Sequence, residues 1–246
     1  MPARWQPVDA VRAWLGANVH VAVDTEHHLI VAQEVTNAGL GQAQLNGMAQ
    51  KAKQALQVNW LDPVADRGYY SGEQIPACER AGIAVTLPRP MTSGAKTAGR
   101  FDKEDCLFRP GKNAYHCPAG ETLPCRYTTL ENGMRLSRYW TNACQACPLK
   151  TDRTTGRERR VTRWEHEHLL ESVQRRLDAD PQAIRVRRET VEHPFGTLKE
   201  RIGATHFLTR TLPRVSAEMV LQVPAYNLTR VLNIMGSKGL LAAIAG

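Results

Sequence analysis

Apolar and polar residues alternate near the start of the chain in a way that predicts a β-hairpin. Residues 18–24 (NVHVAVD) and 29–36 (LIVAQEVT) are rich in β-branched residues, and the polar residues 25–28 separate them. Two such runs around a short polar loop are typical of antiparallel strands. The next pattern predicts a helix, because apolar residues recur at helical spacing on one face. These residues are Leu45, Met48, Ala49, Ala52 and Leu56.

The pattern then returns to strand, helix and strand. Residues 60–65 (WLDPVA) predict a short strand that ends at Asp66. Ser71 begins a capping-box sequence, and Gly82 supplies a stop signal, so a helix is expected between them. Residues 83–87 (IAVTL) predict a further strand. Hairpin, helix, strand, helix and strand in this order indicate an α/β fold.

The amino-acid composition changes after residue 88, where Pro, Gly and polar residues dominate. Two short β-rich runs flank Asn132-Gly133, a strong signal for a two-residue hairpin turn. We therefore expect three regions: residues 1–88 as the first part of the α/β core, residues 89–160 as a β-rich insert, and residues 161–246 as the helical remainder of the core.

Helical patterns dominate that last region. A capping-box sequence at Thr162-x-x-Glu165 predicts a helix start, and Asp180-Pro181 predicts its end. Glu192 lies on the next predicted helix. Residues 213–235 predict a final apolar helix with Pro224 inside it, where a missing backbone hydrogen bond favours a kink.

Composition limits the class of protein. The chain has 246 residues, 42% of them hydrophobic, which is enough for a sizeable core. Its net charge of +8 favours a polyanionic partner such as nucleic acid. No apolar run reaches the length that spans a bilayer, so we expect a soluble cytoplasmic protein without a membrane partner. Six cysteines are too few for a disulfide scaffold.

The segment RVRRETVEHPFGTLKER carries the strongest candidate chemistry. Arg188, Glu192 and Lys199 share one helical face, beside an apolar stripe that includes Val191. A carboxylate flanked by cations is suited to hold a metal ion while its neighbours contact phosphates. An ordinary amphipathic helix with surface ion pairs is the alternative. Asp66, at the end of a predicted strand, is the second candidate, since Mg²⁺ is commonly held by one or two carboxylates and substrate phosphates.

Several segments resemble the DDE transposases of bacterial insertion sequences over nearly the whole chain. They are VAVDTEHHLIVAQEVTN, VADRGYYSGEQI, TSGAKTAGRF, YHCPAGETL, YWTNACQACPLK, RRVTRWEHEHLLE, TVEHPFGTLKERIGATHFLTRTLPRVSAEM and YNLTRVLN. The resemblance implies an RNase H-like mixed sheet with flanking helices, and Mg²⁺- or Mn²⁺-dependent DNA cleavage and strand transfer. It implies Asp66 and Glu192 as the middle and last catalytic carboxylates, with Arg188 and Lys199 as basic members of the site. The implied partners are insertion-sequence ends and target DNA, and a homo-oligomer is left open.

The resemblance also implies a first catalytic carboxylate that this sequence does not supply at the matching place. Asp24 is a weak substitute, because it falls at the tip of the hairpin and matches a family position that is not the catalytic one, and Asp9 is weaker still. We therefore expect a truncated copy that binds divalent metal weakly and does not transpose alone. A catalytically dead DNA-binding or dimerising fragment and a non-functional remnant are the alternatives.

Cys117, Cys144 and Cys147 resemble three members of a four-thiolate zinc site. Arg153 stands where relatives usually have the fourth cysteine, and a guanidinium does not ligate zinc. A complete site would need His116, Cys125 or water. We therefore expect structural zinc to be absent, with well under one zinc per chain in metal analysis. Reduced, partly buried thiols are the alternative state of these cysteines.

Overall fold

A computed structural model describes residues 18–39, 41–90, 94–201 and 207–245 of the protein. The fold divides into two compact units. The first unit lies within Met1–Pro90 and Leu169–Gly246, and the second within Met91–His168. Strands and helices alternate in the first unit, which confirms the α/β class. The RNase H-like topology stays a prediction.

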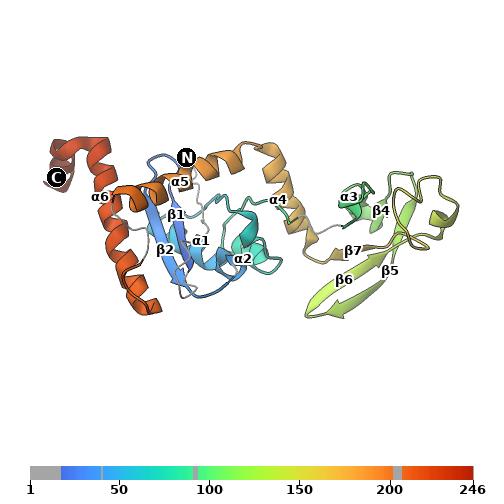
Figure 1. Ribbon diagram of the computed structural model, residues 1–246. Coiled ribbons are helices and arrows are strands. Elements are labelled where there is room, and N and C mark those ends of the chain that lie inside the picture. The colour runs from blue at the N-terminus through green and yellow to red at the C-terminus, as the bar shows by residue number, and fades with distance from the viewer. Residues whose placement is uncertain (1–17, 40, 91–93, 202–206, 246) are drawn as a thin grey trace. The chain divides into compact units, whose positions relative to one another are not determined.

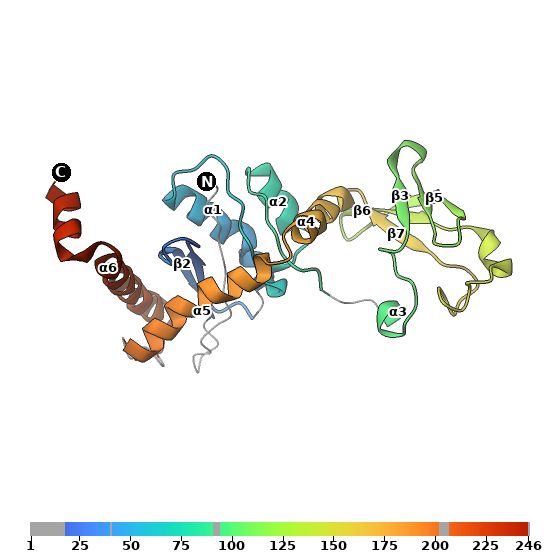
Figure 2. The same ribbon diagram turned by 90° about the horizontal axis from the view of Figure 1, so that it is seen from above.

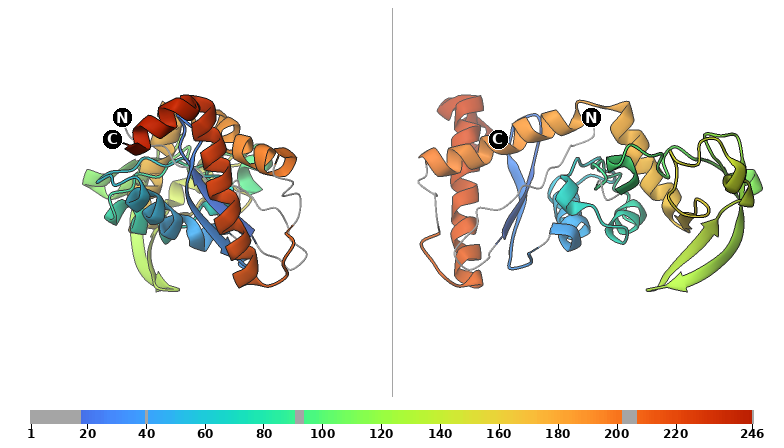
Figure 3. Two further views of the ribbon diagram at one scale, coloured as in Figure 1. Left: turned by 90° about the vertical axis from the view of Figure 1, so that its left-hand side faces the viewer. Right: turned by 45° about the vertical axis from the view of Figure 1, so that its right-hand side comes forward.

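The first unit is built around the predicted hairpin, formed by β1 (Asn18–Val23) and β2 (Ile30–Thr36). Val19, Val21 and Val23 pack with apolar side chains of α5 and α6, whereas Ala22 packs with those of α1. Helices therefore cover both faces of the hairpin, as Figure 1 and the right-hand view of Figure 3 show. The helices of this unit are α1 (Leu45–Ala55), α2 (Gln74–Arg80), α4 (Glu167–Ala179), α5 (Ala183–Arg201) and α6 (Leu212–Ala245), with short 3-10 turns η1 (Gly41–Gln44) and η2 (Arg67–Tyr69).

A short parallel ladder replaces the two further strands predicted for this unit. Leu61 pairs with Ile83 and Val64 with Thr86, through four backbone hydrogen bonds of 2.8–3.3 Å. Pro63 interrupts the ladder, because it has no N–H to donate between the bonds of its neighbours. Among the described residues the hairpin and this ladder are separate hydrogen-bonded pairs, in place of the single mixed sheet expected from the sequence.

Both ends of α2 follow the sequence signals. The Ser71 hydroxyl accepts a hydrogen bond from the Gln74 N–H at 3.4 Å. Gly82 has a φ of +67°, and the Ile83 N–H donates back to the Cys78 carbonyl at 3.0 Å. This is the left-handed helix end that glycine favours.

The second unit is a five-stranded antiparallel meander with strand order β3-β4-β5-β6-β7 (Figure 2). Asn132 and Gly133, both with positive φ, form the predicted tight turn between β5 and β6. Tyr115, Leu123 and Tyr139 are buried in its core. Its elements are α3 (Gly94–Thr97), β3 (Leu107–Arg109), η3 (Pro110–Lys112), β4 (Ala114–His116), β5 (Thr122–Glu131), β6 (Met134–Tyr139), η4 (Asn142–Ala146) and β7 (Val161–Trp164).

The helix start predicted at Thr162 is wrong, because residues 161–164 form β7 and α4 begins at Glu167. Long-range contacts override the local capping pattern here. β7 pairs with β6, and the buried Arg163 guanidinium lies 3.8 Å from the centre of the Phe108 ring. Arg163 also donates to the Tyr115 hydroxyl at 3.1 Å, which fixes the strand in the meander.

The final helix begins close to the predicted position, but its backbone angles break at Gly236 and not at Pro224, where a kink was expected. Helical backbone angles continue from Leu212 through Pro224, and the break comes at Gly236, with φ 70° and ψ 166°. The predicted end at residue 235 is therefore the end of the first helical segment. In the described parts of the chain, no helix is long and apolar enough to cross a membrane.

Candidate active site

Asp66 lies where the parallel ladder ends. The N–H of Ala65 makes the last ladder bond, to Thr86, and the chain then turns into η2. One Asp66 carboxylate oxygen accepts the Arg67 N–H at 2.6 Å, so Asp66 caps this turn. Buried Tyr69, at the end of the turn, is hydrogen-bonded to His20 of β1. The turn that carries Asp66 is thereby attached to the hairpin.

The side chain of Arg187, on α5, contacts Asp66. Its Nη1 lies 3.9 Å from the other Asp66 carboxylate oxygen, and its side chain is only 12% exposed, compared with 35% for Asp66. The residues predicted from the sequence for this site include Arg188 but not Arg187. Helical spacing contained the signal, because Arg187 lies four residues from both Ala183 and Val191, which are buried.

Glu192, Arg188 and Lys199 are exposed on α5, as a site facing DNA requires. None of the three makes an ion pair or hydrogen bond with another described residue. From Arg187 to Glu192 the helix advances by about 7.5 Å and turns through about 140°. The contact of Arg187 with Asp66 therefore brings this part of α5 near Asp66, and convergence of the two carboxylates stays a prediction.

The apolar stripe predicted beside Glu192 is confirmed. Val191 and Leu198 are buried, and Phe195 packs against the cluster that contains Leu198. α5 is continuous through Pro194. Ile202, the last member of the predicted stripe, lies outside the described residues.

Three side chains of α6 hold the tip of the hairpin. Tyr226 donates to the His28 carbonyl at 2.7 Å, and Arg230 Nε donates to the His27 carbonyl at 2.8 Å. Between them, the Asn227 amide accepts the Ile30 N–H at 2.9 Å and donates to the Ile30 carbonyl at 2.8 Å. The α5 backbone contributes as well, since the His28 ring lies 3.3 Å from the Thr190 carbonyl. These bonds fix α5 and α6 against the hairpin.

Asp24, one substitute considered for the first carboxylate, is used in the hairpin turn. One carboxylate oxygen accepts the His27 N–H at 2.7 Å and lies 3.3 Å from the His27 ring nitrogen. This arrangement explains an aspartate at the hairpin tip without a catalytic role. Asp9, the other substitute, lies outside the described residues.

Arg153 lies among the thiols of the second unit. The guanidinium is 3% exposed and donates to the Cys117 sulfur at 2.9 Å. Burial opposes its charge, but Cys117 and the thiols of Cys106 and Cys144 outweigh burial, so the pKa of Arg153 is raised. Burial also raises the pKa of Cys106, against the effect of the Arg153 charge.

Cys117 and Cys144 are buried, Cys147 is partly buried, and all are free thiols. Within the described residues, no three His, Cys, Asp or Glu side chains are grouped so that they could hold a metal ion. The positively charged Arg153 guanidinium contacts Cys117, one of the three cysteines that resemble zinc ligands. Zinc content stays a prediction.

Part of the chain matches the model of a known protein family. Residues 116–232 match a protein-family model described as a transposase DDE domain. These residues belong to the DDE transposase family. The matched segment contains Arg188, Glu192 and Lys199 together with Cys117, Cys144 and Cys147, and it begins after Asp66.

Among solved structures, the chain is similar to the catalytic core domain of BIV integrase, with 19% sequence identity and a TM-score of 0.25. The match covers 36% of this chain and 56% of the integrase chain. The chain thus spans little more than half of that integrase domain. No curated protein matches it.

Proposed function

We propose that this protein acts in DNA transposition, by metal-dependent phosphodiester cleavage and strand transfer. The observation that carries the proposal is the transposase DDE domain at residues 116–232, which includes Glu192. Insertion-sequence ends and target DNA are the proposed substrates. The net charge of +8 agrees with a nucleic-acid partner. We propose that the protein acts in the cytoplasm.

Asp66 and Glu192 are the proposed ligands of a divalent ion. DDE transposases generally use divalent metal ions. Both side chains reach solvent and offer the carboxylate oxygens that Mg²⁺ and Mn²⁺ favour, so the donor chemistry fits. When bound, Mg²⁺ activates a water or a 3′ hydroxyl and stabilises charge on the leaving oxygen. Arg188 and Lys199 are proposed to contact DNA phosphates beside Glu192.

A cleavage and joining assay tests catalysis by this chain. Purified protein is incubated with DNA that carries the element's ends, with Mg²⁺, with Mn²⁺ and with EDTA. Products that require metal and disappear with EDTA support catalysis. DNA binding without products is the result expected from the sequence. It supports the rival proposal, that the chain is a non-catalytic fragment that interferes with a full-length relative. If the chain neither unfolds cooperatively nor binds DNA, both proposals are wrong and the chain is a non-functional remnant.

The exposed face of α6 supports a homo-oligomer. Its apolar residues repeat at alternating spacings of four and three, opposite the buried residues Met219, Val223 and Tyr226. This is the heptad spacing by which two helices pack together, and the same stripe on a second copy is its natural complement. The stripe consists of Leu221, Ala225, Leu228, Leu232 and Met235.

We expect the protein to sediment as a dimer and the Leu228→Glu variant as a monomer. Leu228 is exposed in the single chain, so the variant should keep its fold. Leu241→Glu is the matched control, because Leu241 is an exposed leucine beyond the break at Gly236. A monomeric wild type at micromolar concentration, or dissociation by the control substitution, would contradict this assembly.

A further inference from the structure

A polar cavity lies between α5 and α6, in the first unit. It has a volume of about 160 Å³. Among the described residues, every lining side chain carries a hydrogen-bonding group, and none is a carboxylate. The lining residues are His193, Thr197, Tyr226, Thr229, Arg230 and Asn233.

Arg230 is held in position at this cavity. Its Nε donates to the His27 carbonyl at 2.8 Å, which fixes the plane of the guanidinium. No described residue accepts a hydrogen bond from its terminal nitrogens. A guanidinium anchored in this way presents two N–H-bearing groups in a fork that matches two oxygens of a phosphate.

The neighbouring groups favour an anion as well. Burial raises the pKa of Tyr226 to about 12, so its hydroxyl is neutral at physiological pH. The Asn233 amide and the Thr197 hydroxyl are further donors that carry no negative charge. Among the described lining residues, the Arg230 guanidinium carries a permanent positive charge, so it gives the cavity a positive sign.

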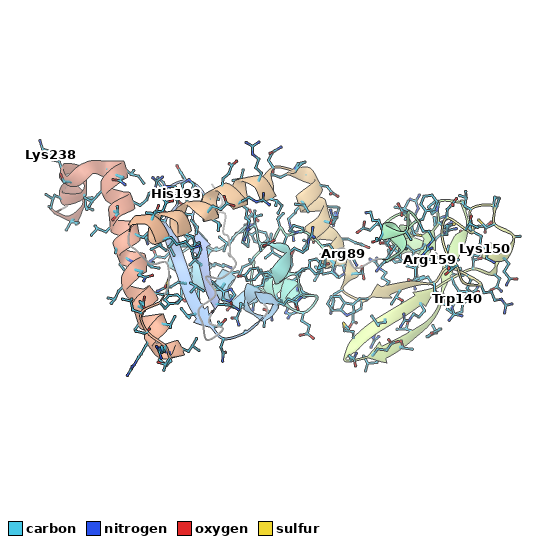
Figure 4. The ribbon with its side chains drawn as sticks, in the orientation of Figure 1. Arg89, Trp140, Lys150, Arg159, His193 and Lys238 are labelled. Carbon is cyan, nitrogen blue, oxygen red and sulfur yellow. The ribbon has the colours of Figure 1, made fainter. Side chains whose placement is uncertain are left out.

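The cavity is next to the proposed catalytic helix face. Glu192 immediately precedes His193, and Thr197 follows one helical turn later, although Glu192 is not part of the lining. A DNA strand whose scissile phosphate lies at Glu192 would pass close to these residues. Figure 4 shows His193 on α5, well separated from Lys238 near the end of α6.

We propose that this cavity binds a phosphodiester group of the DNA backbone, with Arg230 and Asn233 as the principal donors. The inference rests on the proposed function, because it names a contact of the same DNA substrate. Backbone contacts of this kind fix the position of DNA without reading its sequence. The site would hold the strand in register with Glu192.

Fluorescence anisotropy with a labelled duplex tests the proposal across several salt concentrations. Arg230→Gln is expected to weaken binding about tenfold and to lower the slope of log affinity against log salt by about one. Asn233→Ala is expected to weaken binding about threefold with an unchanged slope, because it removes a neutral donor. Lys238→Gln is the matched control, an exposed cation on the same helix outside the cavity.

A diffuse basic surface would give a different result. Arg230→Gln and Lys238→Gln would then weaken binding equally and Asn233→Ala would have no effect, which would overturn the proposal. Arg230 also holds the hairpin, so each variant is checked for unchanged unfolding. Asn233 makes no hydrogen bond with any described residue, so Asn233→Ala keeps the test valid if Arg230→Gln does not fold.

A second measurement separates this inference from the proposed function. Inorganic phosphate is titrated while the imidazole resonances of His193 are followed by NMR. If the wild type does not bind DNA, the proposed function fails, and saturable shifts that Asn233→Ala weakens identify a site for free phosphate. Absence of shifts in the wild type, together with equal DNA affinity of all variants, would remove the cavity as an anion site.

Discussion

Asp66→Asn is expected to weaken Mn²⁺ binding to the protein–DNA complex at least about tenfold, because Mn²⁺ favours carboxylate over amide oxygen. The fold should be retained. Asparagine still accepts the Arg67 N–H as an N-cap, and the lost ion pair with Arg187 is partly exposed, so it contributes at most about 1 kcal/mol. Isothermal titration with Mn²⁺ measures the affinity, and urea unfolding measures the stability.

Glu192→Gln should have the same effect on metal affinity and almost none on stability, since Glu192 is exposed. Glu189→Gln is the matched control. Glu189 lies on the same helix, is exposed and pairs only with Arg185 in a surface ion pair. If DNA cleavage is detected, loss of either metal ligand should slow it by about 100-fold or more.

The double variant decides whether the two carboxylates hold the same ion. Ligands of one ion are coupled, so the combined loss of binding free energy should fall short of the sum of the single losses by about 1 kcal/mol or more. Strictly additive losses would mean that Asp66 and Glu192 act independently. That result would contradict a single ion shared by the two carboxylates.

Asn227→Ala is expected to lower the free energy of unfolding of the first unit by about 2–4 kcal/mol. The Asn227 amide satisfies both backbone groups of Ile30, a buried residue. Removing it leaves a buried N–H and a buried carbonyl without their partner, at about 1–3 kcal/mol each. Asn227→Asp, which keeps the acceptor and loses the donor, should fall between alanine and the wild type.

Thr229→Ala is the control on the same helix, because the Thr229 hydroxyl donates only to the Ala225 carbonyl of its own helix and is exposed. It should change the stability by less than about 0.5 kcal/mol. Hydrogen exchange of the Ile30 amide provides a local readout and should accelerate in Asn227→Ala. Equal unfolding and equal exchange in the two variants would refute a stabilising role for Asn227.

Sequence patterns predicted the elements whose signals are local. The hairpin of β1 and β2, the buried face of α1 and the turn at Asn132-Gly133 all follow from short-range periodicity or turn chemistry. The pattern failed where distant residues compete with it. Thr162 carries a helix-start signal, but Arg163 is buried against Phe108 and Tyr115 from elsewhere in the meander.

The site was predictable in part for the same reason. Asp66 is predicted from its place after an apolar run, and Glu192 from its helix and from the family resemblance, and their role in catalysis stays a prediction. Arg187 was missed because a buried arginine is recognised only by its partner, and that partner, Asp66, is 121 positions away in the sequence. The fixing of Arg230 by His27 is likewise invisible in any local pattern, since it joins α6 to the hairpin tip.

The bonds between α6 and the hairpin also set the order in which the chain folds. Residues 226–230 reach the tip about 200 positions after it has been made, so the first unit stays incomplete until nearly the whole chain has left the ribosome. In the second unit each strand pairs with the next strand along the chain, and the unit has its own buried core, which favours early and independent folding. During synthesis the apolar faces of the hairpin therefore stay uncovered until α5 and α6 have been made. In this interval the chain is most exposed to aggregation or to binding by a chaperone.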